Sequence, residues 1–190
     1  LFLLNLAQFV LHSVWVLYTE HRFGWSTRTV GWSLFAVGVG AAVVQAGLAR
    51  KLIPALGEKR ALMLGLLLGV LSYFGYGLVT QGWMIFVVIA VGSLGGIAAP
   101  AAQAMITKSV AANEQGAVQG AITGLQSVAA ILGPLVGTTV YAFAISDPWR
   151  NEHVPGLSFF VSAGLATLGW LVAGVAVTRR HGVTENVAVS

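Results

Sequence analysis

The chain has 190 residues, of which 57% are apolar and only 8% are charged, and its formal net charge at pH 7 is +4. A single water-soluble core cannot bury so large an apolar share, so the composition excludes an ordinary soluble domain and indicates a bilayer as the solvent. The sequence contains no cysteine, which excludes disulfides and cysteine metal sites.

Six apolar blocks follow one another, and a short polar or basic loop ends each of them. About 20 helical residues at 1.5 Å each cross a hydrocarbon layer of roughly 30 Å, and the blocks lack the period-two alternation of barrel strands. The sequence therefore predicts an all-α polytopic membrane protein. Its spans are expected near 1–18, 27–49, 61–79, 83–107, 115–143 and 157–178. Ser26 and Asn113 are the predicted N-caps of the second and fifth spans.

The basic residues predict the orientation of the bundle. Seven lie on one side, and they are Arg50, Lys51, Lys59, Arg60, Lys108, Arg179 and Arg180; the other side has Arg22, Arg28 and Arg150. By the positive-inside rule, both ends of the chain and a tail at residues 179–190 face the cytoplasm. Because the basic residues are divided among short loops, we expect no nucleic-acid partner.

The start of the chain and the order of its spans indicate a part of a longer protein with an internal repeat. It opens at Leu1 inside an apolar block, without a Met or a basic segment, so we expect a piece of a longer protein and no signal peptide. The six predicted helices also divide near Gly82 into two groups of three that begin on opposite sides of the membrane. That arrangement is the geometry of a 3+3 inverted repeat.

Polar side chains gather on one face of the first predicted helix. Asn5, Gln8 and His12 fall within an arc of about 60°, and Trp15 lies near one edge of that arc. Side chains that both donate and accept need partners inside a membrane, so the arc predicts the wall of a water-filled cavity. The alternative for His12 is a hydrogen bond to a neighbouring helix. All six acidic residues lie in loops or at helix ends, so we expect no carboxylate deep in the bilayer.

The fourth predicted helix has a polar face and a proline. That face comprises Ser93, Gly96, Pro100, Gln103 and Thr107. Pro100 has no backbone N–H for the carbonyl of Gly96, so a bend is predicted there. In the second helix, Gln45 is predicted to contribute to the same cavity.

The fifth predicted helix repeats the pattern. Gln115, Gln119 and Gln126 lie within an arc of about 40°, with Thr123 alongside. Beside them, Gly116, Gly120 and Gly124 form a stripe that predicts the close approach of another helix. The glutamines then face a cavity, or they bond to a neighbouring helix at the cytoplasmic end. Pro134 frees the carbonyl of Ala130, so Pro100, Gly133 and Pro134 are the predicted hinges. The third and sixth helices are predicted to be peripheral.

An ordered string of motifs resembles one family. The segments are 15–25 (WVLYTEHRFGW), 30–34 (VGWSL), 45–46 (QA), 57–59 (GEK), 82–84 (GWM), 95–97 (GGI), 100–103 (PAAQ), 115–120 (QGAVQG) and 133–135 (GPL). Together they resemble the tetracycline/proton antiporters of the major facilitator superfamily, over residues from about 13 to 145.

The resemblance implies a twelve-helix drug exporter of which this chain is the C-terminal half, with its first, second, fourth and fifth helices around a central cavity. It also places Gly57, Lys59 and Arg60 in the superfamily's basic cytoplasmic loop motif, without the acidic residue usual in the N-terminal copy. The chain departs from the family at one point, because exporters of this family often carry a His in the eighth helix. The equivalent position here is Ala41 or its neighbour, and His12 stands in the seventh helix.

Residues and resemblance together predict a secondary active transporter of a bacterial inner membrane. The expected activity is proton-coupled efflux of a tetracycline-like or other amphipathic drug by alternating access. The predicted cavity residues are Asn5, Gln8, His12, Trp15, Gln45, Gln103, Gln119, Thr123 and Gln126. The expected partners are a small-molecule substrate, protons, the lipid bilayer and an N-terminal six-helix half, and we expect no cofactor, no metal and no enzymatic activity.

Two other functions remain open from the sequence. One is a six-helix half-transporter, or a transporter of an endogenous metabolite, that acts as a homodimer. The less favoured one is an intramembrane serine protease, because Ser93 is followed by Leu94 where a protease would have glycine, and no His lies in the second to sixth spans.

Overall fold

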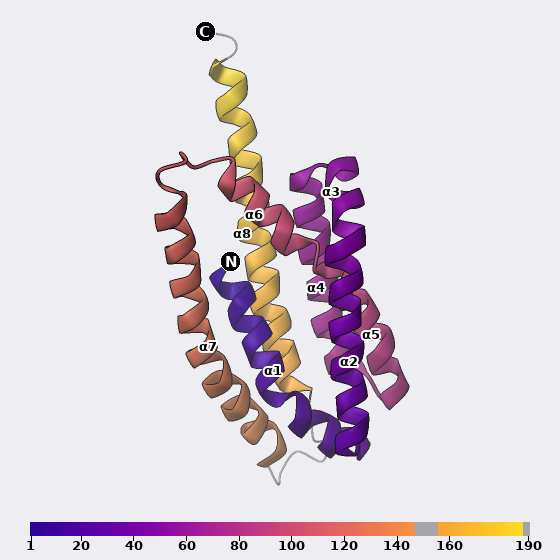
Figure 1. Cartoon of the computed structure of the whole chain (residues 1–190). Coiled ribbons are helices and arrows are strands. Elements are labelled where there is room, and N and C mark those ends of the chain that lie inside the picture. Colours follow the sequence, from indigo (N-terminus) through magenta and orange to yellow (C-terminus); the bar gives the residue numbers. More distant parts are fainter. Residues whose placement is uncertain (147–155, 188–190) are drawn as a thin grey trace.

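The computed structural model describes residues 1–146 and 156–187, with side chains as far as Val177, and these residues form no strand. Arg150 and the acidic residues Asp147 and Glu152 lie outside the described residues. The elements in chain order are α1 (Phe2–Phe23), α2 (Thr27–Val43), a π-helical turn (Val44–Leu48), α3 (Ala49–Leu56), α4 (Glu58–Leu78), α5 (Gly82–Gly95), α6 (Ala98–Thr107), α7 (Gln115–Ser146) and α8 (Leu157–Val187). Figure 1 shows them as a bundle of helices that run side by side.

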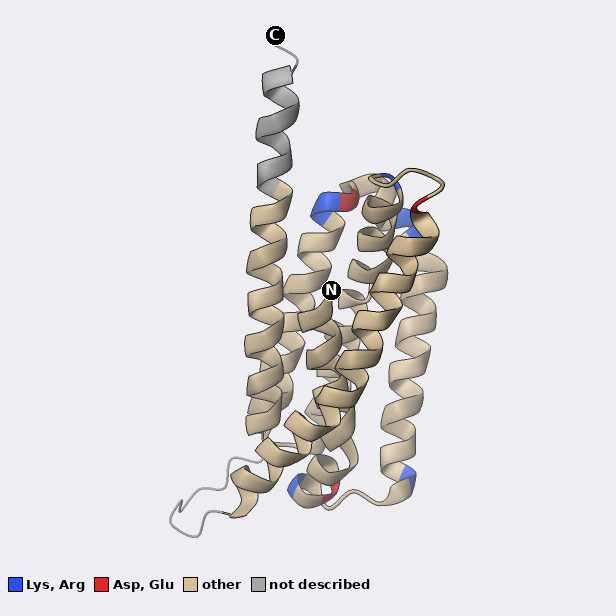
Figure 2. Cartoon of the chain, turned by 90° about the vertical axis from the view of Figure 1, so that its left-hand side faces the viewer, with Lys and Arg blue, Asp and Glu red and all other residues tan. Residues whose placement is uncertain are grey.

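Six of the described helices are long and apolar enough to cross a membrane, so the predicted all-α, six-span fold is confirmed. The second span is a continuous Thr27–Leu56 helix and ends at Gly57, whose φ of 79° only glycine adopts readily. Helix α8 continues to Val187, beyond the predicted end at residue 178, although its apolar part ends at Val177. Figure 2 shows that the Lys, Arg, Asp and Glu residues it colours gather at the two ends of the bundle.

The two predicted N-caps have different outcomes. Ser26 caps α2, since its Oγ accepts a hydrogen bond from the backbone N–H of Thr29 at 3.4 Å. Asn113 is not the cap of α7, because the helix begins at Gln115 and Asn113 lies two residues before it. Glu114 directly precedes Gln115, and the Glu114 carbonyl accepts the N–H of Val118 at 3.1 Å.

The fourth span is interrupted where the sequence predicts a bend. Helix α5 ends at Gly95 and α6 begins at Ala98, so the break falls at Gly96 and Ile97. Pro100 cannot donate to the Gly96 carbonyl, which explains the interruption. Helix α7, by contrast, continues unbroken through Pro134.

Helix α1 lies at the centre of the packing. It packs against α7 and α8, while α4 packs against α5, α6 and α8, and α2 packs against α5. In Figure 1, α1 accordingly lies between α7 and α8. The two groups of three helices that the sequence suggested therefore interleave, because each packs mainly against members of the other.

Small residues permit the closest approach of α1 to α7. A Cβ atom added at Gly137 would lie 2.9 Å from the carbonyl oxygen of Val10 and would also clash with Ser13. A Cβ at Gly133 would clash with Phe9. These two glycines are buried in the α1 interface, so the sequence signal of Gly133 reflects packing as well as its position before Pro134.

We expect Gly137→Leu to destabilise the bundle by about 1–3 kcal/mol or more, because the new side chain overpacks the backbone of α1. Thermal unfolding in detergent measures the loss. Gly164→Leu on α8 is the matched control, since a Cβ there meets nothing within 4 Å and the residue is exposed. Equal melting temperatures for the two variants would contradict the packing of α1 on α7.

Candidate functional site

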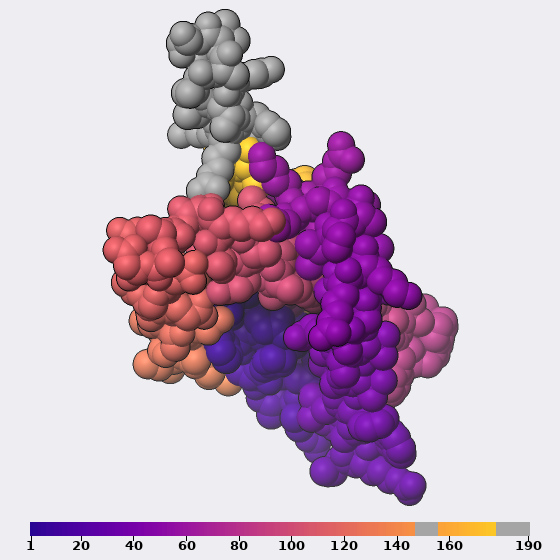
Figure 3. Space-filling model, turned by 45° about the horizontal axis from the view of Figure 1, so that its top comes forward, coloured from indigo at the N-terminus to yellow at the C-terminus, as the bar shows by residue number. Residues whose placement is uncertain are grey.

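A cavity of about 440 Å³ lies between α1, α2, α4, α5, α6 and α7. Figure 3 shows it as a hollow with α1, in indigo, at its floor, between α2 and α3 in purple and the rose and salmon α6 and α7. Most of the lining is apolar, as is usual for a small-molecule site. Its polar side chains therefore identify what it can bind.

Seven of the nine predicted cavity residues lie in this lining. They are Asn5, Gln8, His12, Trp15, Gln45, Gln103 and Gln126. Gln119 is adjacent, since its Oε1 accepts a hydrogen bond from Gln103 Nε2 at 2.8 Å. Thr123 donates to the Gln119 carbonyl at 3.0 Å, within its own helix. No Asp, Glu, Lys or Arg of the described chain lines the cavity.

A hydrogen-bond chain crosses the cavity wall from α4 to α1. The Tyr73 hydroxyl donates to Gln8 Oε1 at 2.8 Å, and Gln8 Nε2 lies 3.0 Å from His12 Nε2. Asn5 Nδ2 donates to the Leu1 carbonyl at 3.2 Å. Asn5, Gln8 and His12 therefore lie together on the cavity side of α1, and Gln8 is bonded to α4.

Trp15 is held rigidly in the wall. Its Nε1–H donates to Ser33 Oγ at 3.0 Å, and its ring makes edge contacts with Tyr76 and Phe159, with centroid distances of 5.1 and 6.4 Å. Only 3% of the residue is exposed. Trp15 thus joins α1 to α2 and presents little of its ring to the cavity.

Helix α4 contributes much more to the cavity than the sequence predicted. Ser72, Tyr73 and Tyr76 line it together with Gly65 and Gly69, so the prediction that the third span is peripheral is wrong. The polar residues of α4 lie on one helical face at spacings of three and four, and the glycines extend that face toward α5 and α6. That spacing was the available signal. Helix α8 contributes only Ala166.

The comparisons with known proteins agree with this geometry. A family model described as "Major Facilitator Superfamily" matches residues 1–189. The chain belongs to the major facilitator superfamily. It is 39% identical to the class G tetracycline resistance protein of Vibrio anguillarum, over 79% of this chain and 38% of that protein.

Two further similar proteins extend the comparison. The chain is 35% identical to the class C tetracycline resistance protein of Escherichia coli, over 86% of this chain and 40% of that protein. It is also 29% identical to the Hippocampus abundant transcript-like protein 1 of Rattus norvegicus, over 90% of this chain and 36% of that protein. The predicted resemblance to tetracycline-resistance proteins is confirmed, and the chain spans about two fifths of the length of these curated relatives.

The glycine stripe of α7 has no neighbour among the described residues. A Cβ atom at Gly116, Gly120 or Gly124 would meet nothing within 4 Å. The predicted close approach of a helix to this stripe is therefore not found among the described residues. Helix α1 approaches α7 farther along, at Gly133 and Gly137, because there the smooth side of α7 faces the bundle.

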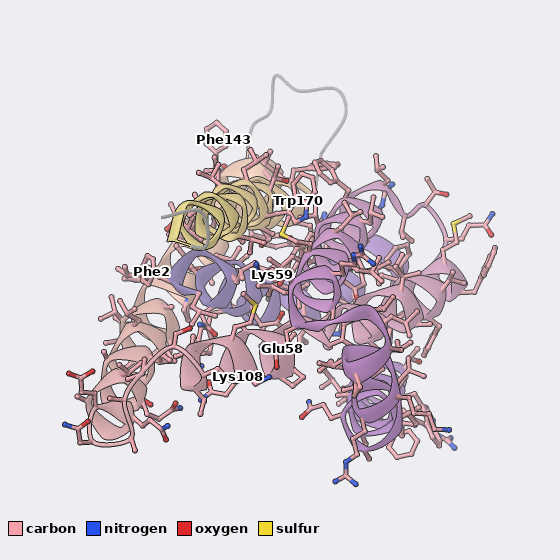
Figure 4. The ribbon with its side chains drawn as sticks, turned by 90° about the horizontal axis from the view of Figure 1, so that it is seen from above. Phe2, Glu58, Lys59, Lys108, Phe143 and Trp170 are labelled. Atoms are coloured by element: carbon pink, nitrogen blue, oxygen red, sulfur yellow. The ribbon has the colours of Figure 1, made fainter. Side chains whose placement is uncertain are left out.

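The loop that matches the superfamily's basic motif is tied to the end of α6. Gly57 ends the second span, and Glu58 begins α4. Lys108 Nζ lies 2.6 Å from Glu58 Oε1, and Figure 4 shows the two side chains pointing toward each other. The pair also suits the helix dipoles, since the acid starts α4 and the base follows the end of α6. Lys59 and Arg60 follow in the first turn of α4.

We expect Ser33→Ala to lower the free energy of unfolding by about 1–3 kcal/mol, because it leaves the buried indole N–H of Trp15 without an acceptor. Thermal unfolding and Trp fluorescence measure the effect. Ser13→Ala is a suitable control, since within the described residues the Ser13 hydroxyl bonds only to the Val10 carbonyl of its own helix. An unchanged melting temperature for Ser33→Ala would show that Trp15 is not anchored there.

We expect Glu58→Lys and Lys108→Glu to lower stability slightly when made singly and the double exchange to restore it. The coupling energy should be about 0.2–1 kcal/mol, because Lys108 is largely exposed. It should fall at high salt. A double-mutant cycle on thermal unfolding at two ionic strengths measures it, and additive effects of the two changes would rule out the pair.

Proposed function

We propose that this chain is the C-terminal half of a secondary active transporter that exports an amphipathic, tetracycline-like drug in exchange for protons. The observation that carries the proposal is the uncharged, amide-bearing cavity in a chain of this superfamily. The names of the similar proteins, which are tetracycline resistance proteins, support the drug class.

The chemistry of the cavity suits a flat, oxygen-rich molecule. Amide side chains from α1, the π-helical turn, α6 and α7 offer both donors and acceptors to its hydroxyl and carbonyl groups. Apolar residues make up the rest of the wall and take up its rings. This wall supplies no side-chain carboxylate. A proton carrier within the wall is therefore an imidazole, and any other carrier lies in another part of the transporter.

His12 supplies that imidazole. The resemblance to tetracycline exporters puts their frequent His at Ala41 or its neighbour, and Ala41 also lines the cavity, so we propose that the same space receives a histidine from α1 in place of α2. An unperturbed imidazole titrates near pH 6.5, within reach of physiological pH. We assign substrate binding and proton exchange to the same wall for this reason.

Alternating access needs a second wall, and the chain leaves one side of the cavity open. Lining residues of α2 and α7 are exposed, among them Leu34 and Gln126. We assign this side to an N-terminal six-helix half, with which the chain rocks about the cavity. Pro100, with the break at Gly96, and the Gly133–Pro134 pair are the proposed hinges.

The orientation in the proposal follows the positive-inside rule. The second and fourth spans end, and α4 begins, at the end of the bundle that carries Arg50, Lys51, Lys59, Arg60 and Lys108. The opposite end has Arg22 and Arg28. We place the first end, both chain termini and the tail at 179–190 in the cytoplasm of a bacterium.

The protease alternative finds no support in the geometry. Ser93 Oγ donates to the Ile89 carbonyl of its own helix at 2.8 Å. His12, which faces the same cavity, bonds to Gln8 and not to Ser93. Since a nucleophilic serine needs a base within hydrogen-bond reach, we keep transport as the single proposal.

We expect His12→Ala and Gln126→Ala, made in the full-length protein, to lower proton-driven drug export by about tenfold each, since each removes a hydrogen-bonding group from the cavity. Tetracycline accumulation in inverted membrane vesicles, with and without an uncoupler, measures export. Gln115→Ala is the matched control, because Gln115 is on the same helix as Gln126 and does not line the cavity.

Two outcomes would refute the assignment. If His12→Ala and Gln126→Ala transport tetracycline like the wild type at equal expression, the cavity is not the binding site. If the wild-type protein accumulates none of a panel of amphipathic drugs in an uncoupler-sensitive way, drug export is not its function.

A further inference from the structure

We propose that Tyr73 is a positioning residue which acts through Gln8 to fix the neutral form of His12, and that a proton gained by His12 reverses this hydrogen-bond chain. The reversal frees the Tyr73 O–H group to donate a hydrogen bond to a ligand in the cavity. This last step rests on the proposed transport function, whereas the hydrogen-bond chain itself stands on the geometry of α1 and α4.

The direction of the chain follows from its first bond. A tyrosine hydroxyl has one proton, and the Tyr73 hydroxyl donates it to Gln8 Oε1 at 2.8 Å. The amide group of Gln8 is thereby oriented, so its Nε2 is the atom that faces His12, 3.0 Å from the ring nitrogen. An amide nitrogen can only donate. His12 Nε2 must therefore be the acceptor, with its lone pair toward Gln8.

This direction fixes the chemical form of His12. A ring with an unprotonated Nε2 carries its proton on Nδ1, so His12 is neutral and in the Nδ1–H tautomer, the minor tautomer of free histidine in water. The only hydrogen bond of the His12 ring within the described residues is the one to Gln8. The Nδ1–H group is therefore available to an acceptor in the cavity that His12 lines.

A proton from cavity water has one place to go on this ring, and that is Nε2. The imidazolium then has an N–H on each nitrogen, and its Nε2–H faces a Gln8 group that can only donate. The conflict is removed when the Gln8 amide turns over, so that Oε1 accepts from His12 and Nε2 donates to the Tyr73 oxygen. No covalent bond other than the new N–H changes.

The reversed chain changes what the cavity offers. Tyr73 now accepts from Gln8, so its hydroxyl proton is free to turn toward the cavity, which its side chain lines from a mostly buried position. A ligand with a carbonyl or hydroxyl oxygen gains a donor when His12 is protonated and loses it when the proton leaves. Proton and ligand are thus coupled through two rotations, that of the Gln8 amide and that of the Tyr73 hydroxyl.

No charged side chain competes for this switch in the described part of the lining. From α4, the titratable side chains in the lining are Tyr73 and Tyr76, and α1 contributes His12 itself. The residues that the other described helices contribute to the lining include no Asp, Glu, Lys, Arg or His. The protonation state of His12 therefore depends mainly on this hydrogen-bond chain and on what enters the cavity.

Nitrogen-15 NMR of the full-length protein in bilayers, with labelled histidine and glutamine side chains, tests the proposal directly. His12 is assigned by the signal lost in His12→Asn. At alkaline pH we expect an excess of about fivefold of the Nδ1–H over the Nε2–H tautomer, because one hydrogen bond to the ring depends on it. On acidification, the Gln8 side-chain amide signal should change at the same pH as the His12 signals.

Two variants separate positioning from mere packing. Tyr73→Phe keeps the buried ring and removes the hydroxyl, so the tautomer excess should fall to about twofold or less, or reverse. Tyr76→Phe is the matched control, a buried tyrosine of the same helix and the same cavity wall, and should leave the excess unchanged.

Three results would overturn the proposal: a proton on Nε2 in wild-type His12 at alkaline pH, a Gln8 amide signal that does not follow the titration of His12, or equal effects of Tyr73→Phe and Tyr76→Phe. The NMR result does not depend on transport. Absence of tetracycline export by the wild type would therefore remove the proposed function and the ligand step, while the switch itself would be judged by the NMR signals alone.

Discussion

Every polar group inside a bilayer has to find its hydrogen-bond partner within the protein, and this requirement determines how the six spans pack. Ser158 and Ser162 of α8 donate to the carbonyls of Gly137 on α7 and Ala7 on α1. Tyr18 and Tyr141 donate to the carbonyls of Tyr76 and Leu17. None of the buried side-chain N or O atoms in the described residues lacks a partner. These bonds connect α1 to α4, α7 and α8, and they are what makes α1 the central helix.

The same requirement explains which parts of the structure could be predicted from the sequence. The number and type of the spans follow from hydropathy and length, and the break at Gly96 follows from the missing N–H of Pro100, because both are properties of one segment. The role of α4 depends on which neighbour each face of the helix meets. Tyr73 fits a packing position as well as a cavity position, so its polarity alone did not decide between them. The glycine stripe of α7 posed the same problem, since spacing shows a smooth face and not its neighbour.

In the cavity, some polar side chains have no hydrogen-bond partner within the described part of the chain. Gln103 is bonded to Gln119, and Gln8 lies between Tyr73 and His12, but Gln45 and Gln126 make no side-chain hydrogen bond within the described part of the chain. Their unmet bonds need water or a ligand. The seven predicted residues that lie in the lining were chosen because polar side chains with no reason to be in lipid mark a wet surface. Trp15 was the exception, since its indole N–H finds Ser33 and its ring is enclosed.

The position of the imidazole shows how such a cavity can vary while the fold is retained. Ala41 and His12 are on different helices, yet both line the same space, so a histidine at either position would lie at the wall of the same cavity. What differs is the partner of the ring. On α1, the ring meets Gln8, one turn away, and through it Tyr73 on α4. An imidazole at Ala41 would face the cavity from α2 without that chain. In the proposed proton exchange, the position of the ring therefore sets where the proton is held, and the neighbours of the ring set what its arrival does.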